Sequence, residues 1–311
     1  MNKLIILTGP TAAGKTKLSI ALAHAINGEI ISADSMQVYR HMDIGSAKIH
    51  PEEMQGIKHH LVDILEPSED FNIVLFQRYA KHAMAEIYEK GKIPILVGGT
   101  GFYIQSVLYD IDFCESDTNT ALRAELEIIA EQKGTAYLHN MLKECDEKAA
   151  EEIHENNVKR VIRAIEFFRE TGKKISEHNE TERQKQSPYD ARYFVLTDER
   201  QKLYENIDRR VDIMIENGLV KEVQKLLDMG CKRDFTSMQG LGYKEIISYL
   251  EGEITLDEAV YIIKRDTRHF AKRQLTWFRR ERDVIWIEKN KFAYDEEKML
   301  NYMLGAISGE R

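Results

Sequence analysis

The chain has 311 residues, of which 43% are hydrophobic and 31% are charged, which is enough for an apolar core and one large or two small domains. Its net charge of −8 gives no general indication of nucleic-acid binding, and no run approaches the roughly 18 apolar residues of a membrane span. Three widely spaced cysteines, Cys114, Cys145 and Cys231, indicate neither a disulfide framework nor a zinc site, so we expect reduced thiols. The apolar start of the chain is too short for a signal peptide. We therefore expect a cytoplasmic protein without a membrane anchor.

Short apolar runs alternate with helical patterns over the first part of the chain. The runs predict buried strands at 3–9, 29–34, 60–65 and 94–99. Helical spacing is found between them, at 15–26 and 71–90. Strands that alternate with helices in this way are typical of βαβ units and predict a parallel sheet.

The composition changes after the fourth predicted strand. The stretch that follows is rich in Glu, Lys, Ala and Leu, with several helical periods and no convincing strand. Apolar runs at 191–197 and 283–288 then predict two further strands. We therefore expect an α/β fold whose parallel-sheet core, with C-terminal helices, is built from 1–115 and 190–311. A helical insertion domain at 116–189 would interrupt this core.

The sequence GPTAAGKT, residues 9–16, follows the first predicted strand and precedes the first predicted helix. This is the setting of a P-loop, in which glycines let backbone N–H groups converge on phosphate oxygens at a helix N-terminus. Lys15 would supply a positive charge for the terminal phosphates, and Thr16 a hydroxyl for Mg²⁺. The spacing predicts a bound phosphate group, held by Gly9, Thr11, Ala12, Ala13, Gly14, Lys15 and Thr16.

The P-loop alone leaves the reaction open, because kinases, ATPases, GTPases and some transferases all use one. A nucleotide hydrolase places an acid after a second apolar strand to help hold Mg²⁺. Asp34 ends the second predicted strand and fits either a metal helper or a base, since ligands bind at the C-terminal edge of parallel sheets. We interpret the neighbouring pair His59-His60 as structural rather than as a metal site.

Further stretches carry a resemblance to a known family. They are SADSMQVYRHMDIGSAK (32–48), HHLVDI (59–64), PILVGGTGFYI (94–104), NNVKRVIRAIE (156–166), GLGYKE (240–245) and TRHFAKRQLTWFRR (267–280). Together with GPTAAGKT, and in this order over nearly the whole chain, they resemble the tRNA dimethylallyltransferase family. The resemblance implies a P-loop NTPase-like core that moves a prenyl group from dimethylallyl diphosphate to N6 of adenosine 37 in tRNA. The leaving diphosphate would occupy the P-loop.

The resemblance also implies roles for individual residues. Asp34 would be the base that takes the N6 proton, Thr100 would contact the same nucleotide, and Arg210 would lie near the diphosphate. A carboxylate suits the first role because the exocyclic amine of adenine is a poor nucleophile, and arginine suits the last because it binds phosphate oxygens in pairs. The resemblance extends the tRNA contacts to Ser35, Met36, Gln37 and Arg123.

Local charge indicates an RNA surface where the total charge does not. The stretch from Lys264 to Arg282 contains eight Lys or Arg residues and two acidic residues, with aromatic residues between them. Such a stretch is typical of nucleic-acid surfaces, although the aromatic residues fit core anchors equally well. A predicted helix at 158–168 carries apolar residues on one face and basic residues on the rest, which also fits a solvated face. The candidate tRNA contacts in these stretches are Lys159, Arg160, Arg163, Arg273 and Arg279.

A stacked adenine has to be extruded before it reacts, and unstacked loops are what RNA-binding proteins read. From the resemblance we expect the insertion to grip the anticodon stem-loop while the core receives the base, and we expect a monomer. Three alternatives remain: a small-molecule P-loop kinase, a prenyltransferase acting on free adenine nucleotides, and a non-catalytic RNA-binding module. The kinase would leave DSMQ and the basic C-terminal stretch without a role.

Overall fold

The computed structural model describes residues 1–113 and 120–309. It divides into two compact units. The core unit is Met1–Leu108 with Pro188–Arg311, and the insertion unit is Tyr109–Ser187. The expected boundary between residues 115 and 116, like Cys114, lies outside the described residues, and the expected return to the core at 190 compares with Pro188.

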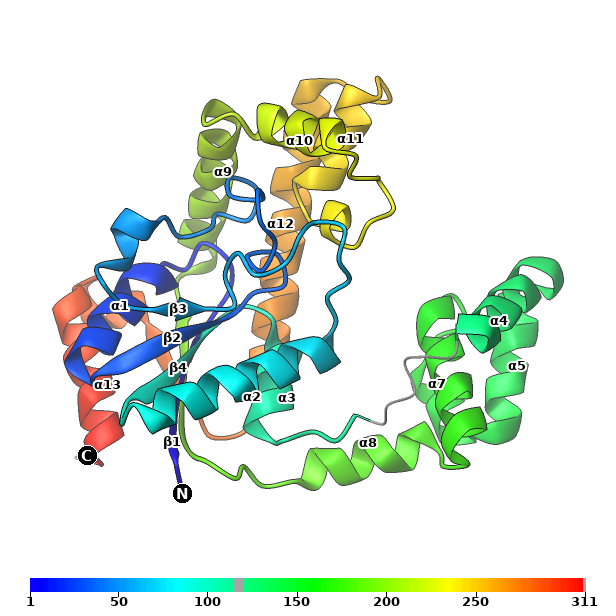
Figure 1. Ribbon diagram of the computed structural model, residues 1–311, viewed down its shortest axis with the longest axis horizontal. Coiled ribbons are helices and arrows are strands. Elements are labelled where there is room, and N and C mark those ends of the chain that lie inside the picture. Colours follow the sequence, from blue (N-terminus) through cyan, green and yellow to red (C-terminus); the bar gives the residue numbers. More distant parts are fainter. Residues whose placement is uncertain (114–119, 310–311) are drawn as a thin grey trace. The chain divides into compact units, whose positions relative to one another are not determined.

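A six-stranded sheet in the order β3-β2-β4-β1-β5-β6 forms the centre of the core unit (Figure 1). Its strands are β1 (Lys3–Thr8), β2 (Gly28–Ala33), β3 (His59–His60), β4 (Ile93–Gly98), β5 (Asp190–Thr197) and β6 (Val284–Glu288). Each neighbouring pair is parallel, as predicted. Successive residues of β1, Leu4 to Leu7, are all fully buried, because helices cover both faces of a parallel sheet.

Helices of the core unit pack on this sheet and on one another. They are α1 (Lys15–Ala25), α2 (Ile73–Glu89), α3 (Gly101–Leu108), α9 (Arg200–Glu216), α10 (Leu219–Asp228), α11 (Tyr243–Leu250), α12 (Leu256–Phe278) and α13 (Glu296–Ser308). Side chains of α1 and α13 share one hydrophobic core with the sheet, whereas α2 packs on β2 and β4. The long helix α12 packs along α9 and α11. None of the helices within residues 1–113 and 120–309 is both long and apolar enough to cross a membrane.

The insertion unit is helical throughout its described part. Its helices are α4 (Thr120–Lys133), α5 (Thr135–Cys145), α6 (Glu147–Glu152), α7 (Val158–Thr171) and α8 (Ile175–Gln184) (Figure 1, green). The buried carboxylate of Asp146 accepts hydrogen bonds from Ala149 N at 3.0 Å and Ser176 N at 2.9 Å, so it caps both α6 and the start of α8. The apolar face predicted for α7 forms the core of this unit, with Val161, Ile162 and Ile165 buried.

The strand predicted at 60–65 is wrong beyond its first residue. Strand β3 ends at His60, and Leu61 and Asp63 then adopt positive φ angles of 62° and 55°. Such angles are incompatible with a strand. The chain turns here because the Asp63 side chain is held by Lys48, from a distant part of the sequence.

A buried carboxylate anchors the N-terminal ends of the strands. The Glu29 side chain is 4% exposed and contacts His60 Nε2 at 2.8 Å, Lys92 Nζ at 2.9 Å and Lys90 Nζ at 3.2 Å. Burial raises the pKa of Glu29, but the hydrogen bonds from His60, Lys92 and Lys90 outweigh it and lower that pKa to about 2. The ionised form is therefore the one that the fold favours.

We expect Glu29→Gln to lower the free energy of unfolding at neutral pH by about 1–3 kcal/mol, because Lys90 and Lys92 lose their counter-charge and His60 loses a charged hydrogen-bond acceptor. Since the folded pKa lies below the ordinary 4.5, this contribution is present above pH 4.5 and is lost as the pH falls toward about 2. Urea unfolding at about pH 7 and about pH 3.5 measures it. A difference between the wild type and the variant that does not shrink at the lower pH would contradict this account.

Candidate active site

The phosphate loop between β1 and α1 depends on three residues with positive φ angles. Gly9, Ala12 and Gly14 have φ of 145°, 61° and 91°. A side chain at Gly9 is excluded because its Cβ would lie 2.1 Å from the carbonyl oxygen of Leu196 on β5. Helix α1 begins directly after Gly14, so its first N–H groups have no helical acceptor and are available to an anion. The predicted P-loop is therefore formed.

Two cations of the predicted site lie at this loop, and a third, Lys289, approaches it with Nζ 3.4 Å from Ala13 O. Lys15 Nζ lies 2.9 Å from the carbonyl oxygens of both Gly9 and Pro10. Arg210, on α9, lies with Nη1 3.4 Å from Thr11 Oγ1. Burial, followed by the neighbouring charge of Arg210, lowers the pKa of Lys15 to about 8, and Asp34 opposes this shift. Burial also lowers the pKa of Arg210, and the negative charge of Asp34 again acts in the opposite direction. The electrostatic contacts bring together the lysine, the arginine and the carboxylate predicted from the sequence.

One buried residue that the sequence analysis did not single out joins two loops of the site. Gln274, on α12, accepts a hydrogen bond from Thr11 N at 2.9 Å and donates one to Gly99 O at 2.9 Å. Its signal in the sequence is a polar residue at helical spacing from the buried Ala271 and Phe278. Because Gln274 occupies the amide of Thr11, and Ala13 N donates to Pro10 O, not every amide of the loop is open to a phosphate.

Asp34 and Thr100 meet at the C-terminal ends of neighbouring strands. Strands β2 and β4 pair as far as Ala33 and Gly98, and the amide of Thr100 donates to the carbonyl of Ala33 at 3.3 Å. Oδ1 of Asp34 accepts from the backbone N–H of Met36 at 2.9 Å and, more weakly, from that of Gln37 at 3.4 Å. The carboxylate thus shapes the turn of the DSMQ motif as well as facing the two cations.

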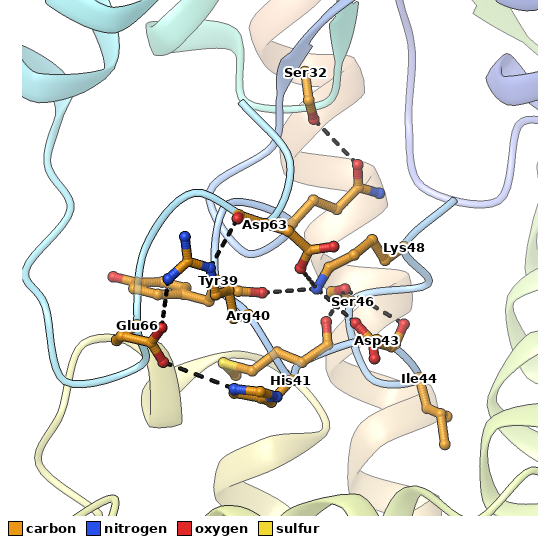
Figure 2. Close-up of polar contacts among 12 residues, drawn as sticks. Ser32, Tyr39, Arg40, His41, Asp43, Ile44, Ser46, Lys48, Asp63 and Glu66 are labelled. Carbon is orange, nitrogen blue, oxygen red and sulfur yellow. Dashed lines mark hydrogen bonds and ion pairs between the residues drawn. The ribbon is translucent and has the colours of Figure 1, made fainter. Parts of the chain in front are cut away.

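The other residues of the DSMQ motif are held in different ways. The amide of Gln37 is oriented from both sides. Its Oε1 accepts from Ser32 Oγ at 3.1 Å, the bond drawn at Ser32 in Figure 2, and its Nε2 donates to Ala47 O at 3.4 Å. Met36 packs against Gly240, where a Cβ would lie 2.5 Å from the methionine methyl carbon. Ser35 is half-buried. The motif is one structured turn, and its contacts with RNA stay a prediction.

The metal ligand predicted from the sequence is a single hydroxyl, that of Thr16. Thr16 is exposed in the first turn of α1. Within the described residues, no group of three or more His, Cys, Asp or Glu side chains is placed to hold a metal ion. Mg²⁺ commonly keeps several waters and binds through phosphate oxygens with few protein ligands, so this hydroxyl fits an ion that arrives with a diphosphate.

A cavity of about 620 Å³ lies at the C-terminal ends of β5 and β6, between the first turns of α9 and the last turns of α12. Its lining includes Asp198, Tyr204, Lys272, Arg279 and Trp286. The Asp198 side chain is 1% exposed, and its Oδ2 has no hydrogen-bond partner within the described chain, the nearest cation being Lys289 Nζ at 4.0 Å. Arg279, expected at the tRNA, therefore borders a cavity.

Some basic residues of the stretch 264–282 have partners within the protein, and its contact with RNA stays a prediction. Lys264 pairs with Asp212 of α9 at 2.5 Å, and Arg268 pairs with Asp208 of the same helix at 2.5 Å. Phe278 is fully buried and serves as a core anchor. Arg273 remains exposed, with its guanidinium 5.8 Å from the ring centroid of Phe270.

In the insertion unit the predicted tRNA contacts differ in their surroundings. Arg123 donates from Nε and Nη2 to both carboxylate oxygens of the buried Glu166, at 3.0 and 2.8 Å. It therefore has a structural role that the sequence analysis did not anticipate. Lys159 and Arg160 are exposed on α7, and Arg163 is half-buried there. The contact of these four residues with tRNA stays a prediction.

Comparison with known proteins places these features in a family. The IPP transferase family model matches residues 37–281. A tRNA dimethylallyltransferase of Lachnoclostridium phytofermentans is 64% identical over 295 residues, covering 95% of this chain and 94% of that protein. One of Acetivibrio thermocellus is 53% identical over 309 residues, covering 99% of each.

Solved structures agree with this match. The full-length tRNA isopentenylpyrophosphate transferase of Bacillus halodurans has a TM-score of 0.75 at 45% identity, covering 100% of this chain and 98% of that chain. A eukaryotic dimethylallyltransferase acting on tRNA has a TM-score of 0.85 at 29% identity, covering 100% of this chain and 81% of that chain. With its P-loop, its DSMQ turn and its parallel sheet, the chain belongs to the tRNA dimethylallyltransferase family.

Proposed function

We propose that this protein transfers the dimethylallyl group of dimethylallyl diphosphate to N6 of adenosine 37 in tRNA and releases diphosphate. The observation that carries the proposal is the meeting of an anion-binding loop and a carboxylate at the C-terminal ends of β1 and β2, the two strands that flank β4. Lys15 and Arg210 lie at the loop, and Asp34 lies close enough to oppose the pKa shifts of both. Membership of the family selects prenyl transfer among the reactions that a P-loop serves.

The loop would bind the leaving group. As the bond between C1 of the prenyl group and the diphosphate oxygen breaks, negative charge builds on that oxygen. The free N–H groups at the start of α1, with Lys15 and Arg210, stabilise this charge without reorganisation, because the backbone and α9 already hold them in place. Thr16 is the residue that would hold Mg²⁺, whose charge would further neutralise the diphosphate.

Asp34 would act on the nucleophile. A new bond forms between N6 and C1, and the proton leaves N6 for the carboxylate of Asp34. The hydrogen bonds that Oδ1 accepts from Met36 N and Gln37 N hold the carboxylate in one orientation. Thr100, whose backbone is tied to the neighbouring strand at Ala33, is placed to contact the same nucleotide.

The tRNA would be bound through its anticodon stem-loop. Exposed basic residues of α7 and α12, Lys159, Arg160 and Arg273, would contact phosphates. The core unit by itself supplies Lys15, Asp34 and Arg210, which supports a monomer as the working form. We place its work in the cytoplasm, where tRNA is available.

One experiment separates this function from a kinase. The protein is incubated with unmodified tRNA and labelled dimethylallyl diphosphate, and in parallel with ATP. Label in the tRNA supports the proposal. Label in free adenine nucleotides instead would show that these nucleotides, and not tRNA, accept the prenyl group. Turnover of ATP without prenylation would refute prenyl transfer.

Asp34→Asn tests the base. Asparagine keeps the oxygen that caps the turn, but it loses the charge and cannot take the proton. We expect kcat to fall by roughly 10²- to 10⁴-fold, while affinity for dimethylallyl diphosphate changes little. The rate is measured against Mg²⁺ concentration, and recovery at high Mg²⁺ would show that Asp34 serves the metal rather than N6.

The pH dependence of diphosphate binding tests Lys15. Its pKa in the free protein is about 8, and a bound anion favours the charged form, so binding takes up a proton above that pH. We expect affinity for inorganic diphosphate to fall as the pH rises from about 7.5 to about 9.5. Calorimetric titration measures it, and Lys15→Arg, which keeps its charge, should flatten the curve. An equally steep curve for Lys15→Arg would assign the proton elsewhere.

The basic residues should act electrostatically. We expect Lys159→Gln with Arg160→Gln, or Arg273→Gln alone, to raise the KM for tRNA without changing donor affinity. Each lost phosphate contact should reduce the slope of log affinity against log salt by about one unit or somewhat less. Lys3→Gln with Lys58→Gln, at the other end of the strands, is the charge-matched control. An equal loss of tRNA affinity in the control would show that the effect comes from the net charge of the protein and not from these positions.

A further inference from the structure

The stretch GLGYKE, residues 240–245, supports the family resemblance, but the proposed reaction gives it no task. In the structure it lies beside the segment 34–48, which contains the DSMQ turn. The contact between the two depends on glycines. A Cβ at Gly45 would lie 2.5 Å from the ring of Tyr243, and one at Gly240 would meet Met36 at the same distance. A side chain at Gly45 would therefore clash with the Tyr243 ring, whereas one at Gly240 would require the end of the Met36 side chain to move.

The centre of this contact is the carboxylate of Glu222, on α10. Its Oε2 accepts hydrogen bonds from Asp43 N at 2.9 Å and Ile44 N at 2.7 Å. Its Oε1 accepts from Gly45 N at 3.0 Å and from the hydroxyl of Tyr243 at 2.8 Å. Three consecutive backbone amides thus converge on one side-chain anion, an arrangement that binds anions well.

The tyrosine remains a donor over the working pH range. Burial, followed by the negative charge of Glu222, raises the pKa of Tyr243 well above its ordinary value. The four hydrogen bonds to Glu222 therefore come from donors that do not titrate near neutral pH. This anchor is a permanent feature of the fold and not a pH switch.

Lys48 lies between this anchor and the DSMQ turn, and Figure 2 shows its ammonium group among Tyr39, Asp43 and Asp63. Its side chain is 3% exposed, and Nζ lies 2.7 Å from Tyr39 O, 2.6 Å from Asp43 Oδ1 and 2.5 Å from Asp63 Oδ1. These three partners match the three donors of an ammonium group. Asp43 is thus held twice, at its amide by Glu222 and at its carboxylate by Lys48.

Ala47, the residue before Lys48, connects this segment to Gln37. Ala47 O accepts a hydrogen bond from Gln37 Nε2, so the position of Ala47 orients the amide of Gln37. The backbone carbonyl of Gln37 accepts from Asp63 N at 3.2 Å, beside the Asp63 carboxylate that Lys48 binds. A continuous set of contacts therefore runs from Glu222 to the side chain of Gln37.

We infer that Glu222 is a positioning residue, which holds the amides of residues 43–45 from α10 and so fixes the segment 34–48 in the conformation that presents Gln37 to tRNA. This inference rests on the proposed function, since Gln37 is assigned to the nucleotide there. Asp34 depends less on the anchor, because β2 and its own turn hold it. The anchor should therefore affect binding of tRNA more than the chemical step.

Two substitutions of the anchor differ in a predictable order. In Glu222→Gln one oxygen serves two donors, and the new NH₂ group faces the other two. The Tyr243 hydroxyl can turn to accept from it, but a backbone N–H cannot, so at least one amide loses its acceptor. In Tyr243→Phe all three amides keep theirs. We expect the KM for tRNA to rise about tenfold or more in Glu222→Gln and less than about threefold in Tyr243→Phe.

The donor side of the reaction supplies the internal control. For Glu222→Gln, kcat should stay within about threefold and affinity for inorganic diphosphate within about twofold, since the P-loop makes no contact with Glu222. Glu216→Gln, which removes an exposed carboxylate at the end of α9, should leave all three constants unchanged. A general loss of folding would instead lower diphosphate affinity and kcat together. If Glu222→Gln does not fold, Glu222→Asp, which keeps the charge but is one methylene shorter, replaces it.

Amide hydrogen exchange without tRNA measures the anchor directly. Residues 37–45 should exchange faster in Glu222→Gln than in the wild type or in Glu216→Gln. Unchanged exchange would overturn the anchor, and faster exchange with an unchanged KM for tRNA would overturn the positioning role. A wild-type protein that fails to prenylate tRNA would refute the proposed function, whatever the exchange rates are.

Discussion

The two hydrogen bonds of the Gln274 side chain hold the active site together. They join the amide of Thr11 in the phosphate loop to the carbonyl of Gly99, next to Thr100. A buried amide with both ends satisfied fixes distance and orientation, and losing either bond would leave a buried polar group unpaired. The place of Gln274 depends in turn on α12, which Lys264 and Arg268 tie to α9. Arg210 lies on α9, so the same packing brings the arginine to the loop.

How far the sequence predicts the fold depends on the range of the interactions. Local apolar runs predict the strands β1, β2, β4, β5 and β6. The phosphate loop is predicted by a short motif in which Gly9 and Gly14 adopt the positive φ angles that glycine allows. The strand expected at 60–65 failed because Asp63 turns toward Lys48, a partner that no local pattern reveals. The basic stretch of α12 was only partly informative for the same reason, since Asp208 and Asp212 lie far away in the sequence.

The candidate site shows the same division. Lys15, Asp34 and Arg210 were named from motif and resemblance, and the structure brings them together. Gln274 was missed although it lies within a quoted stretch, and Glu222 was missed because it lies outside all of them. Their partners are backbone groups of distant loops, and a backbone group leaves no trace in the sequence. Arg123 was assigned to RNA from the resemblance alone, and its ion pair with the buried Glu166 joins residues far apart in the sequence.

Charge balance explains why the anchors of the segment 34–48 differ from the groups that would bind substrate. A diphosphate site requires positive potential that the protein leaves unneutralised, and within the described residues Asp34 is the carboxylate that opposes the pKa shifts of both Lys15 and Arg210. Any structural charge nearby that lacked its own partners would alter this potential, because buried charges are weakly screened. Lys48 is balanced by two carboxylates, and Glu222 by three amides and a hydroxyl. The segment is thus held by strong charged contacts, whereas the excess positive charge stays at the phosphate loop.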